Sequence, residues 1–80
     1  MYSVYVLYSS GYDKIYVGFT SNLEARLTHH NHPKNHGWTA RYKPWKMIYH
    51  EHFISKKEAM IREKQLKSAA GRLFIKTNLL

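Results

Sequence analysis

The sequence contains no cysteine, only five acidic residues and no long apolar run. The lack of cysteine excludes a disulfide framework, a thiolate zinc site and a cysteine nucleophile. Because no apolar run approaches the roughly 18 residues of a membrane-spanning helix, we expect no membrane partner. The N-terminus, Met1 to Val4, carries no basic stretch ahead of an apolar one, so we expect no signal peptide and a cytoplasmic location.

The chain has 80 residues and is expected to form one domain, residues 1–80. A domain of this size buries only about 60–65% of the surface of its unfolded chain. This excludes a two-lobed enzyme and a deep cage for a large cofactor. Hydrophobic residues make up 44% of the chain and aromatic residues 15%, which predicts a compact core rather than disorder.

The charge of the chain is strongly one-sided. Thirteen Lys and Arg residues stand against five Asp and Glu residues, which gives a net charge of +8. Such an excess repels itself in a compact fold, so it favours a polyanionic partner, nucleic acid above all. The alternative is that the charge serves solubility alone, which needs less charge and either sign.

Three segments have the β-branched and aromatic composition of strands: residues 2–8, 15–18 and 46–53. The turn-forming residues 9–14 predict that the first two strands form a hairpin. The expected order is two strands, a helix, a loop, a third strand and a second helix, with residues 72–80 as a last short helix or tail. This order predicts an α+β fold with a small antiparallel sheet packed against helices.

Two capping boxes mark the expected helix starts. Ser21 is followed by Glu24 and Ser55 by Glu58, the spacing at which the two side chains satisfy free N–H groups at a helix N-terminus. The expected helices therefore cover about residues 22–30 and 55–69. Gly71 is suited to the C-terminal cap of the second helix.

Glu63 is the one acidic residue without an ordinary structural role. Two of the others begin helices, one lies in a turn, and one is expected to be exposed on the third strand: Glu24, Glu58, Asp13 and Glu51. Glu63 shares the apolar stripe of its helix with Ala59 and Leu66, where a carboxylate is costly unless it is paired or binds a metal. Mg²⁺ is often held by one or two carboxylates. The alternative is an ion pair with Lys67, four residues on.

The segment between the first helix and the third strand is basic and aromatic. Four cations are candidate contacts to DNA phosphates: Lys34, Arg41, Lys43 and Lys46. Trp38 and Trp45 offer faces to unstacked bases, although at least one of them is expected to fill the core. Four histidines suggest a zinc site, which we disfavour because the loop gives them no fixed geometry: His29, His30, His32 and His36.

The motifs Ser3-Val4-Tyr5 and Tyr16-Val17-Gly18, with Tyr16 eleven residues past Tyr5, resemble those of the GIY-YIG nuclease family. Arg26 follows ten residues past Tyr16, on the first expected helix. The first motif matches the family fully only at its tyrosine. The resemblance is strongest to short standalone bacterial members, and it implies a three-stranded antiparallel sheet flanked by helices.

The resemblance also implies metal-dependent cleavage of DNA phosphodiester bonds. Tyr5 would orient the attacking water or the phosphate, and Arg26 would face the transferring phosphoryl group. Glu63 would hold a single Mg²⁺ or Mn²⁺ ion, and Gly18 would leave room for the scissile strand. Asn78 matches a late asparagine that supports the site in some members.

The identity of the general base stays open at this stage. Tyr16 is the base that the resemblance implies, but a free tyrosine has a pKa of about 10 and needs a nearby cation to act. His30 falls beside the site in the family pattern and has an ordinary pKa closer to neutrality.

The substrate and partners also stay open. Branched DNA, nicked DNA and RNA all suit the charge. Few groups remain to grip a duplex, so a protein partner or a homodimer would supply specificity. The alternative functions are a basic nucleic-acid-binding module without catalysis and a plain interaction domain.

Overall fold

The computed structural model describes residues 1–34 and 37–80. Its centre is a three-stranded antiparallel sheet in the order β2-β1-β3, made of β1 (Tyr2–Ser9), β2 (Lys14–Thr20) and β3 (Lys46–Phe53). The first strand is therefore central, and β2 and β3 are the two edges. The predicted α+β fold with a three-stranded antiparallel sheet is confirmed.

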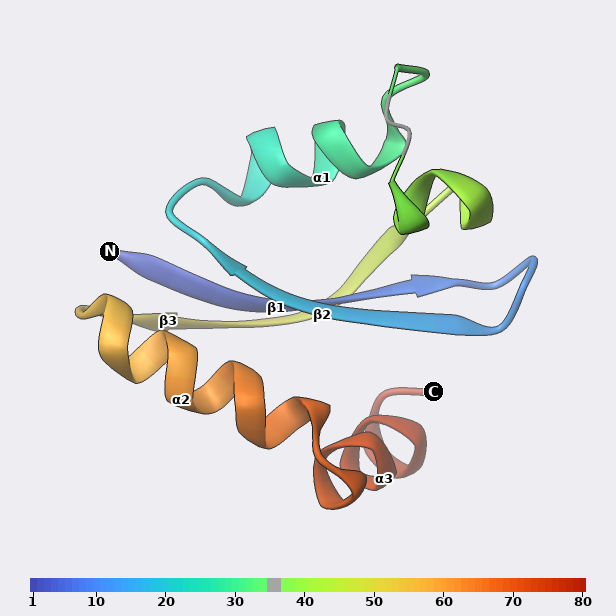
Figure 1. Cartoon of the computed structure of the whole chain (residues 1–80). Coiled ribbons are helices and arrows are strands. Elements are labelled where there is room, and N and C mark those ends of the chain that lie inside the picture. The colour runs from blue at the N-terminus through green and yellow to red at the C-terminus, as the bar shows by residue number, and fades with distance from the viewer. Residues whose placement is uncertain (35–36) are drawn as a thin grey trace.

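The helices lie on both faces of this sheet (Figure 1). Helix α1 (Leu23–Asn31) and a 3-10 helix (Trp38–Tyr42) cover one face. Helices α2 (Lys56–Lys67) and α3 (Ala69–Asn78) cover the other. None of the helices in the described part of the chain has the length and apolar character of a membrane span.

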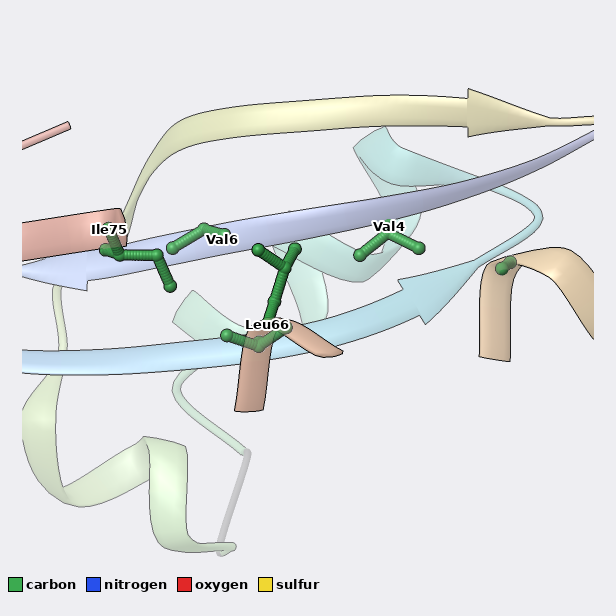
Figure 2. Packing of buried hydrophobic residues seen from close by; sticks show 6 residues of the cluster. Val4, Val6, Leu66 and Ile75 are labelled. Carbon is green, nitrogen blue, oxygen red and sulfur yellow. The ribbon is translucent and has the colours of Figure 1, made fainter. Parts of the chain in front are cut away.

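The alternation of β1 supplies both cores, because successive side chains of a strand point to opposite faces. Val4 and Val6 pack with Leu66 and Ile75 on the side of α2 and α3, as Figure 2 shows. Residues Tyr5 and Leu7 pack with Trp45 on the side of α1. Fully burying a side chain of this size contributes about 1.5–3 kcal/mol. The central strand therefore holds both helical layers in place.

The first helix begins one residue later than the capping box predicts. Asn22, not Ser21, is the N-cap, and its Oδ1 accepts a hydrogen bond from the Ala25 amide at 3.1 Å. The reason is Thr20, whose Oγ1 accepts from the Asn22 amide at 3.1 Å and holds that residue in an extended conformation. Asparagine and serine are equally good N-caps, so the local hydrogen bonds decide between them.

The second helix begins at the predicted cap but ends earlier than expected. Ser55 accepts a hydrogen bond from the Glu58 amide at 3.1 Å, which confirms the second capping box. The helix stops at Lys67 rather than near residue 69, because Ser68 begins α3 by accepting from the Gly71 amide at 3.2 Å. Residues 69–78 thus form a full helix rather than a tail.

The prediction that Gly71 caps the C-terminus of the second helix is therefore wrong. Gly71 belongs to the first turn of α3. A Cβ atom at this position would lie 2.2 Å from the Gln65 carbonyl oxygen and 2.5 Å from the Leu66 Cα. The missing side chain lets α3 pack directly against the end of α2.

Glu51 is also not the exposed strand residue that the sequence predicts. Its carboxylate pairs with Arg62 of α2 at 2.9 Å and accepts a hydrogen bond from the Tyr49 hydroxyl. Burial opposes the charge of Glu51, but the hydrogen bonds from Arg62 and Tyr49 outweigh it and hold the pKa of the carboxyl below its usual range. This pair ties α2 to β3.

We predict that Gly71→Ala lowers the free energy of unfolding by about 1–3 kcal/mol, because the added methyl group meets backbone atoms that cannot move aside. Alanine is otherwise the better helix former by about 1 kcal/mol, so a loss of stability isolates the steric effect. Urea denaturation followed by circular dichroism measures it. Gly11→Ala is the control, since nothing lies within 4 Å of its added Cβ. Equal stability of the two variants would contradict this account of the α2–α3 contact.

Candidate active site

The two motif tyrosines lie side by side because of the β1–β2 register. Tyr5 is opposite Gly18 and Leu7 is opposite Tyr16, so the two tyrosines are diagonal neighbours on adjacent strands. Their ring centroids are 6.1 Å apart. Tyr5 is buried and Tyr16 is half-buried, which leaves Tyr16 the more accessible of the two phenols.

Gly18 makes room for the Tyr5 phenol. A Cβ atom on Gly18 would lie 2.6 Å from the Tyr5 hydroxyl oxygen and 3.0 Å from the Tyr16 ring. The resemblance implied that this space serves the scissile strand. In the structure the phenol of Tyr5 occupies the space beside Gly18, and Gly18 also lines a hollow at the edge strand β2, so its role toward a DNA strand stays a prediction.

A hollow of about 380 Å³, here called the site hollow, lies at the edge strand β2 and is lined from β1, β2, α1 and α2. It contains five of the predicted site residues: Tyr5, Tyr16, Gly18, Arg26 and Glu63. Arg26 comes from α1 on one face of the sheet and Glu63 from α2 on the other (Figure 1). Residues far apart in the sequence therefore converge on one place.

Glu63 lies among cations. Its side chain is 18% exposed, and Lys67 Nζ lies 3.6 Å from its Oε2, so the predicted alternative of an ion pair is present. Lys67 is itself 51% exposed, and ion pairs of this kind contribute at most about 1 kcal/mol. Glu63 thus both pairs with Lys67 and lines the site hollow with Arg26.

The donor set of the site hollow fits a hard divalent cation with few protein ligands. Glu63 is the one carboxylate among the described residues that line it. Mg²⁺ and similar ions use one or two carboxylates together with water and phosphate oxygens. In residues 1–34 and 37–80, no group of three or more His, Asp or Glu side chains is placed to hold a metal.

The histidines do not assemble a zinc site in the described part of the chain. His30 is buried between Tyr5 and Thr39, and His32 Nδ1 accepts a hydrogen bond from the Lys34 amide at 3.0 Å. His36 lies outside the described residues.

His30 lies behind Tyr5. Its Nε2 is 3.0 Å from the Tyr5 hydroxyl, and its Nδ1 is 3.1 Å from the Thr39 Oγ1. Burial, with Tyr16 nearby, raises the pKa of Tyr5 above its usual range, so the phenol stays protonated. We infer that the Tyr5 hydroxyl donates to Nε2 and that Nδ1–H donates to Thr39, which fixes the orientation of the Tyr5 phenol.

The electrostatic surroundings keep His30 neutral. Burial is the largest cause and the charge of Arg26 the second, and together with His29 they lower the pKa of His30 from 6.5 to about 4. A neutral imidazole can accept a hydrogen bond from the Tyr5 hydroxyl at one nitrogen and donate a hydrogen bond from the other.

Five other predicted residues do not line the site hollow: Lys34, Arg41, Lys43, Lys46 and Asn78. Lys43 donates to the His32 carbonyl at 3.0 Å. Asn78 is exposed, and its amide donates to the Phe74 carbonyl of its own helix at 3.0 Å. Their roles in contacting DNA or supporting the site therefore remain predictions.

Sequence reasoning missed Tyr2, Lys56 and Thr39. Tyr2 and Lys56 line the site hollow, and Thr39 positions His30. Lys56 has a usable signal, because it precedes Glu63 by seven residues on one helix and therefore shares its face. Thr39 has none, since it lies in an aromatic segment with no periodicity. As expected, one tryptophan fills the core: Trp45 is buried, whereas Trp38 is 47% exposed.

We predict that protonation of His30 destabilises the fold. Because its pKa falls from 6.5 to about 4 on folding, the unfolded chain binds the proton more readily, and stability is lost as the pH falls from about 6.5 toward 4. The loss in the free energy of unfolding over this pH range is about 3 kcal/mol. Urea denaturation at several pH values measures it, and His30→Gln should flatten the profile. His50→Gln removes an exposed histidine as the control. A His30→Gln profile as steep as that of the wild type would refute this assignment.

Comparison with known proteins identifies the family. A UPF0213 protein of Staphylococcus haemolyticus is 41% identical over 56 residues, which cover 70% of this chain and 68% of that protein. A UPF0213 protein of Natronomonas pharaonis is 37% identical over 65 residues, 81% and 75% of the two chains. A third, from Bacillus pumilus, is 39% identical over 54 residues, 68% and 55% of the two chains.

No solved structure is significantly similar to the chain. The family model described as the GIY-YIG catalytic domain matches residues 1–77, nearly the whole length of the sequence. The resemblance seen in the two tyrosine motifs is thereby confirmed, and the chain belongs to the GIY-YIG family, a family of the nuclease type.

Proposed function

We propose that the protein is a metal-dependent endonuclease that hydrolyses DNA phosphodiester bonds in the site hollow. The observation that carries the proposal is the convergence of Arg26 and Glu63, from helices on opposite faces of the sheet, on one accessible hollow with Tyr5 and Tyr16. Phosphodiester hydrolysis needs an activated water, neutralised phosphoryl oxygens and a stabilised leaving oxygen. These four side chains have the chemistry for those tasks.

Glu63 is the residue that would hold the metal. A bound Mg²⁺ or Mn²⁺ would act as a Lewis acid on a phosphate oxygen and position the substrate. Lys67 would leave the carboxylate when the ion binds, and its position at 51% exposure gives it room to turn away.

Arg26 suits the negative charge that develops on the phosphoryl oxygens. It is exposed at the site hollow, and its guanidinium offers a planar set of N–H donors with a permanent charge. Lys56 lines the same hollow and adds a second cation. Donors of this kind stabilise a transition state most when they are already in place before the reaction.

Tyr16 is the stronger candidate for the general base, and Tyr5 for a positioning group. Tyr16 lines the site hollow together with Arg26 and Glu63, so its hydroxyl is open to the place where a metal-bound phosphate and the attacking water would lie. The His30 ring packs against Tyr16, with 4.6 Å between the ring centroids, but its two nitrogens contact Tyr5 and Thr39 and the residue does not line the site hollow. Tyr5 stays protonated with its O–H directed at His30, so its hydroxyl oxygen would position the attacking water by accepting a hydrogen bond from it.

The second candidate function is a basic nucleic-acid-binding module without turnover. The Glu63–Lys67 ion pair favours it, because a carboxylate that is already neutralised has less affinity for a metal. The incomplete first motif, Ser3-Val4-Tyr5, points the same way. Both functions use the net charge of +8 to bind DNA, and metal-dependent cleavage alone separates them.

The same proposal includes the type of nucleic acid, the partners and the cellular location of the protein. The charge favours DNA, nicked or branched forms included, and RNA is the competing substrate. The small number of groups around the site hollow suggests that a protein partner or a second copy of the chain completes the grip on a duplex. We propose that the protein acts in the cytoplasm.

We predict metal-dependent nicking when the protein is incubated with nicked and branched DNA in Mg²⁺ or Mn²⁺, and none in EDTA. Glu63→Gln and Arg26→Ala should each lower the cleavage rate by about 10²–10³-fold, because each removes stabilisation of charge at the phosphate. Glu24→Gln and Lys64→Ala make the same charge changes at exposed positions outside the site hollow and should retain activity.

Two results would overturn parts of this proposal. Cleavage that survives both Glu63→Gln and Arg26→Ala would show that the site is wrong. Salt-sensitive binding of DNA with no cleavage in either metal would favour the module without turnover.

A further inference from the structure

A second hollow of about 500 Å³ lies beside the site hollow along the edge strand β2. We call it the basic hollow. Tyr16 lines both hollows, and Lys67 lines the basic hollow while its Nζ contacts Glu63 of the site hollow. The two hollows are therefore neighbours, and a chain of phosphates that crosses one can continue into the other. The volume of the basic hollow is within the range of about 300–1,000 Å³ that small-molecule sites occupy.

The basic hollow is lined by four exposed cations: Lys14, Lys67, Arg72 and Lys76. They come from the start of β2, the end of α2 and one side of α3, where Arg72 and Lys76 are four residues apart. The one acidic residue among them, Asp13, accepts a hydrogen bond from the Tyr8 hydroxyl at 2.9 Å. Figure 1 shows the β1–β2 hairpin, the 3-10 helix and α3 at the same end of the molecule.

Trp38 adds an aromatic surface to this basic lining. It is 47% exposed, although a tryptophan is costly to leave in water. Three aromatic rings surround it, with centroid distances of 4.9 Å to Tyr42, 5.8 Å to Trp45 and 6.4 Å to Tyr16. Trp45 fills the core, whereas Trp38 packs against these rings with part of its indole and leaves the rest open to solvent. The open part of the indole is therefore available for a stacking contact.

We propose that the basic hollow binds an unpaired nucleotide of the DNA strand, next to the phosphate that lies in the site hollow. Trp38 stacks on the base, and Lys67, Arg72 and Lys76 contact the phosphates on that side. A base inside a duplex has both faces covered by its neighbours, so only an unpaired base offers a face to the indole. The preferred substrate is therefore DNA with a single-stranded segment adjoining the point of cleavage. That the bound nucleotide lies next to a cleaved phosphate rests on the proposed function. Binding of an unpaired nucleotide in the basic hollow does not.

Binding in EDTA tests the role of Trp38 without cleavage. Fluorescence anisotropy compares a labelled single strand of about 16 nucleotides with a duplex of the same length. Trp38→Ala should weaken binding of the single strand about 5- to 100-fold, the equivalent of about 1–3 kcal/mol, and binding of the duplex less than about twofold. Trp38→Phe keeps a stacking surface and should retain most of the affinity. Equal losses for single strand and duplex would overturn the proposal.

The cations are tested by two double variants with the same change of charge. Arg72→Gln/Lys76→Gln removes two cations of the basic hollow, whereas Lys57→Gln/Lys64→Gln removes two exposed cations of α2 outside it. The slope of log Kd against log salt for the single strand should fall by about 1.4 in the first variant, because each phosphate contact on a single strand contributes about 0.7. The second variant should change it little. Equal changes in both variants would overturn the proposal.

Assays of cleavage and of binding test the nuclease function and the basic hollow separately. Binding that depends on Trp38 in a protein without nuclease activity would support the basic hollow and refute the proposed function. Cleavage that prefers fully paired DNA and ignores both Trp38→Ala and Arg72→Gln/Lys76→Gln would refute the basic hollow and leave the nuclease intact.

Discussion

The pairing of β1 with β2 is the constraint on which the site depends. It places the Tyr5 phenol over Gly18, so close that an added Cβ would lie 2.6 Å from the Tyr5 hydroxyl oxygen, and it sets Tyr16 diagonally beside Tyr5. From this position Tyr5 contacts His30 of α1, which attaches the helix that carries Arg26. The alternate residues of the same strand hold α2 and α3 on the other face. One buried strand therefore fixes both helices that supply charged side chains.

The electrostatics of the site follow from the shortage of acids in the chain. With five acidic residues against thirteen basic ones, a carboxylate at the site hollow finds itself among cations whether or not it binds a metal. Lys67 pairs with Glu63, with its Nζ 3.6 Å from the carboxylate Oε2. The same excess of cations extends along β2 to Arg72 and Lys76, which makes the whole edge attractive to a polyanion. Under the proposed function a single spare carboxylate would be sufficient, because phosphate and water would supply the other ligands.

Sequence reasoning predicted the strands from their β-branched and aromatic composition, and it placed Glu63 on the apolar stripe of its helix from the helical period. It failed where the outcome depends on a contact between distant segments. Gly71 was assigned to a cap because the close approach of α3 to α2 leaves no local pattern. Glu51 was expected to be exposed because its partner Arg62 lies on another element. The choice of Asn22 as the N-cap of α1 depends on a hydrogen bond from its amide to the Thr20 hydroxyl oxygen, and the contact of Thr39 with His30 joins two different elements. The motifs identified residues that line one hollow, but not the contacts, such as that of Thr39 with His30, that position their neighbours.

The central claim is that Glu63 holds a metal ion beside Arg26 and Tyr16, and paramagnetic broadening by Mn²⁺ measures this directly. In an NMR titration with Mn²⁺, we expect the amide signals of Gly18, Arg26, Lys56 and Glu63 to broaden first, and Glu63→Gln to abolish the effect. Broadening centred instead on the adjacent rings of His50 and His52, which lie 5.0 Å apart on β3, or broadening that Glu63→Gln leaves unchanged, would contradict the account.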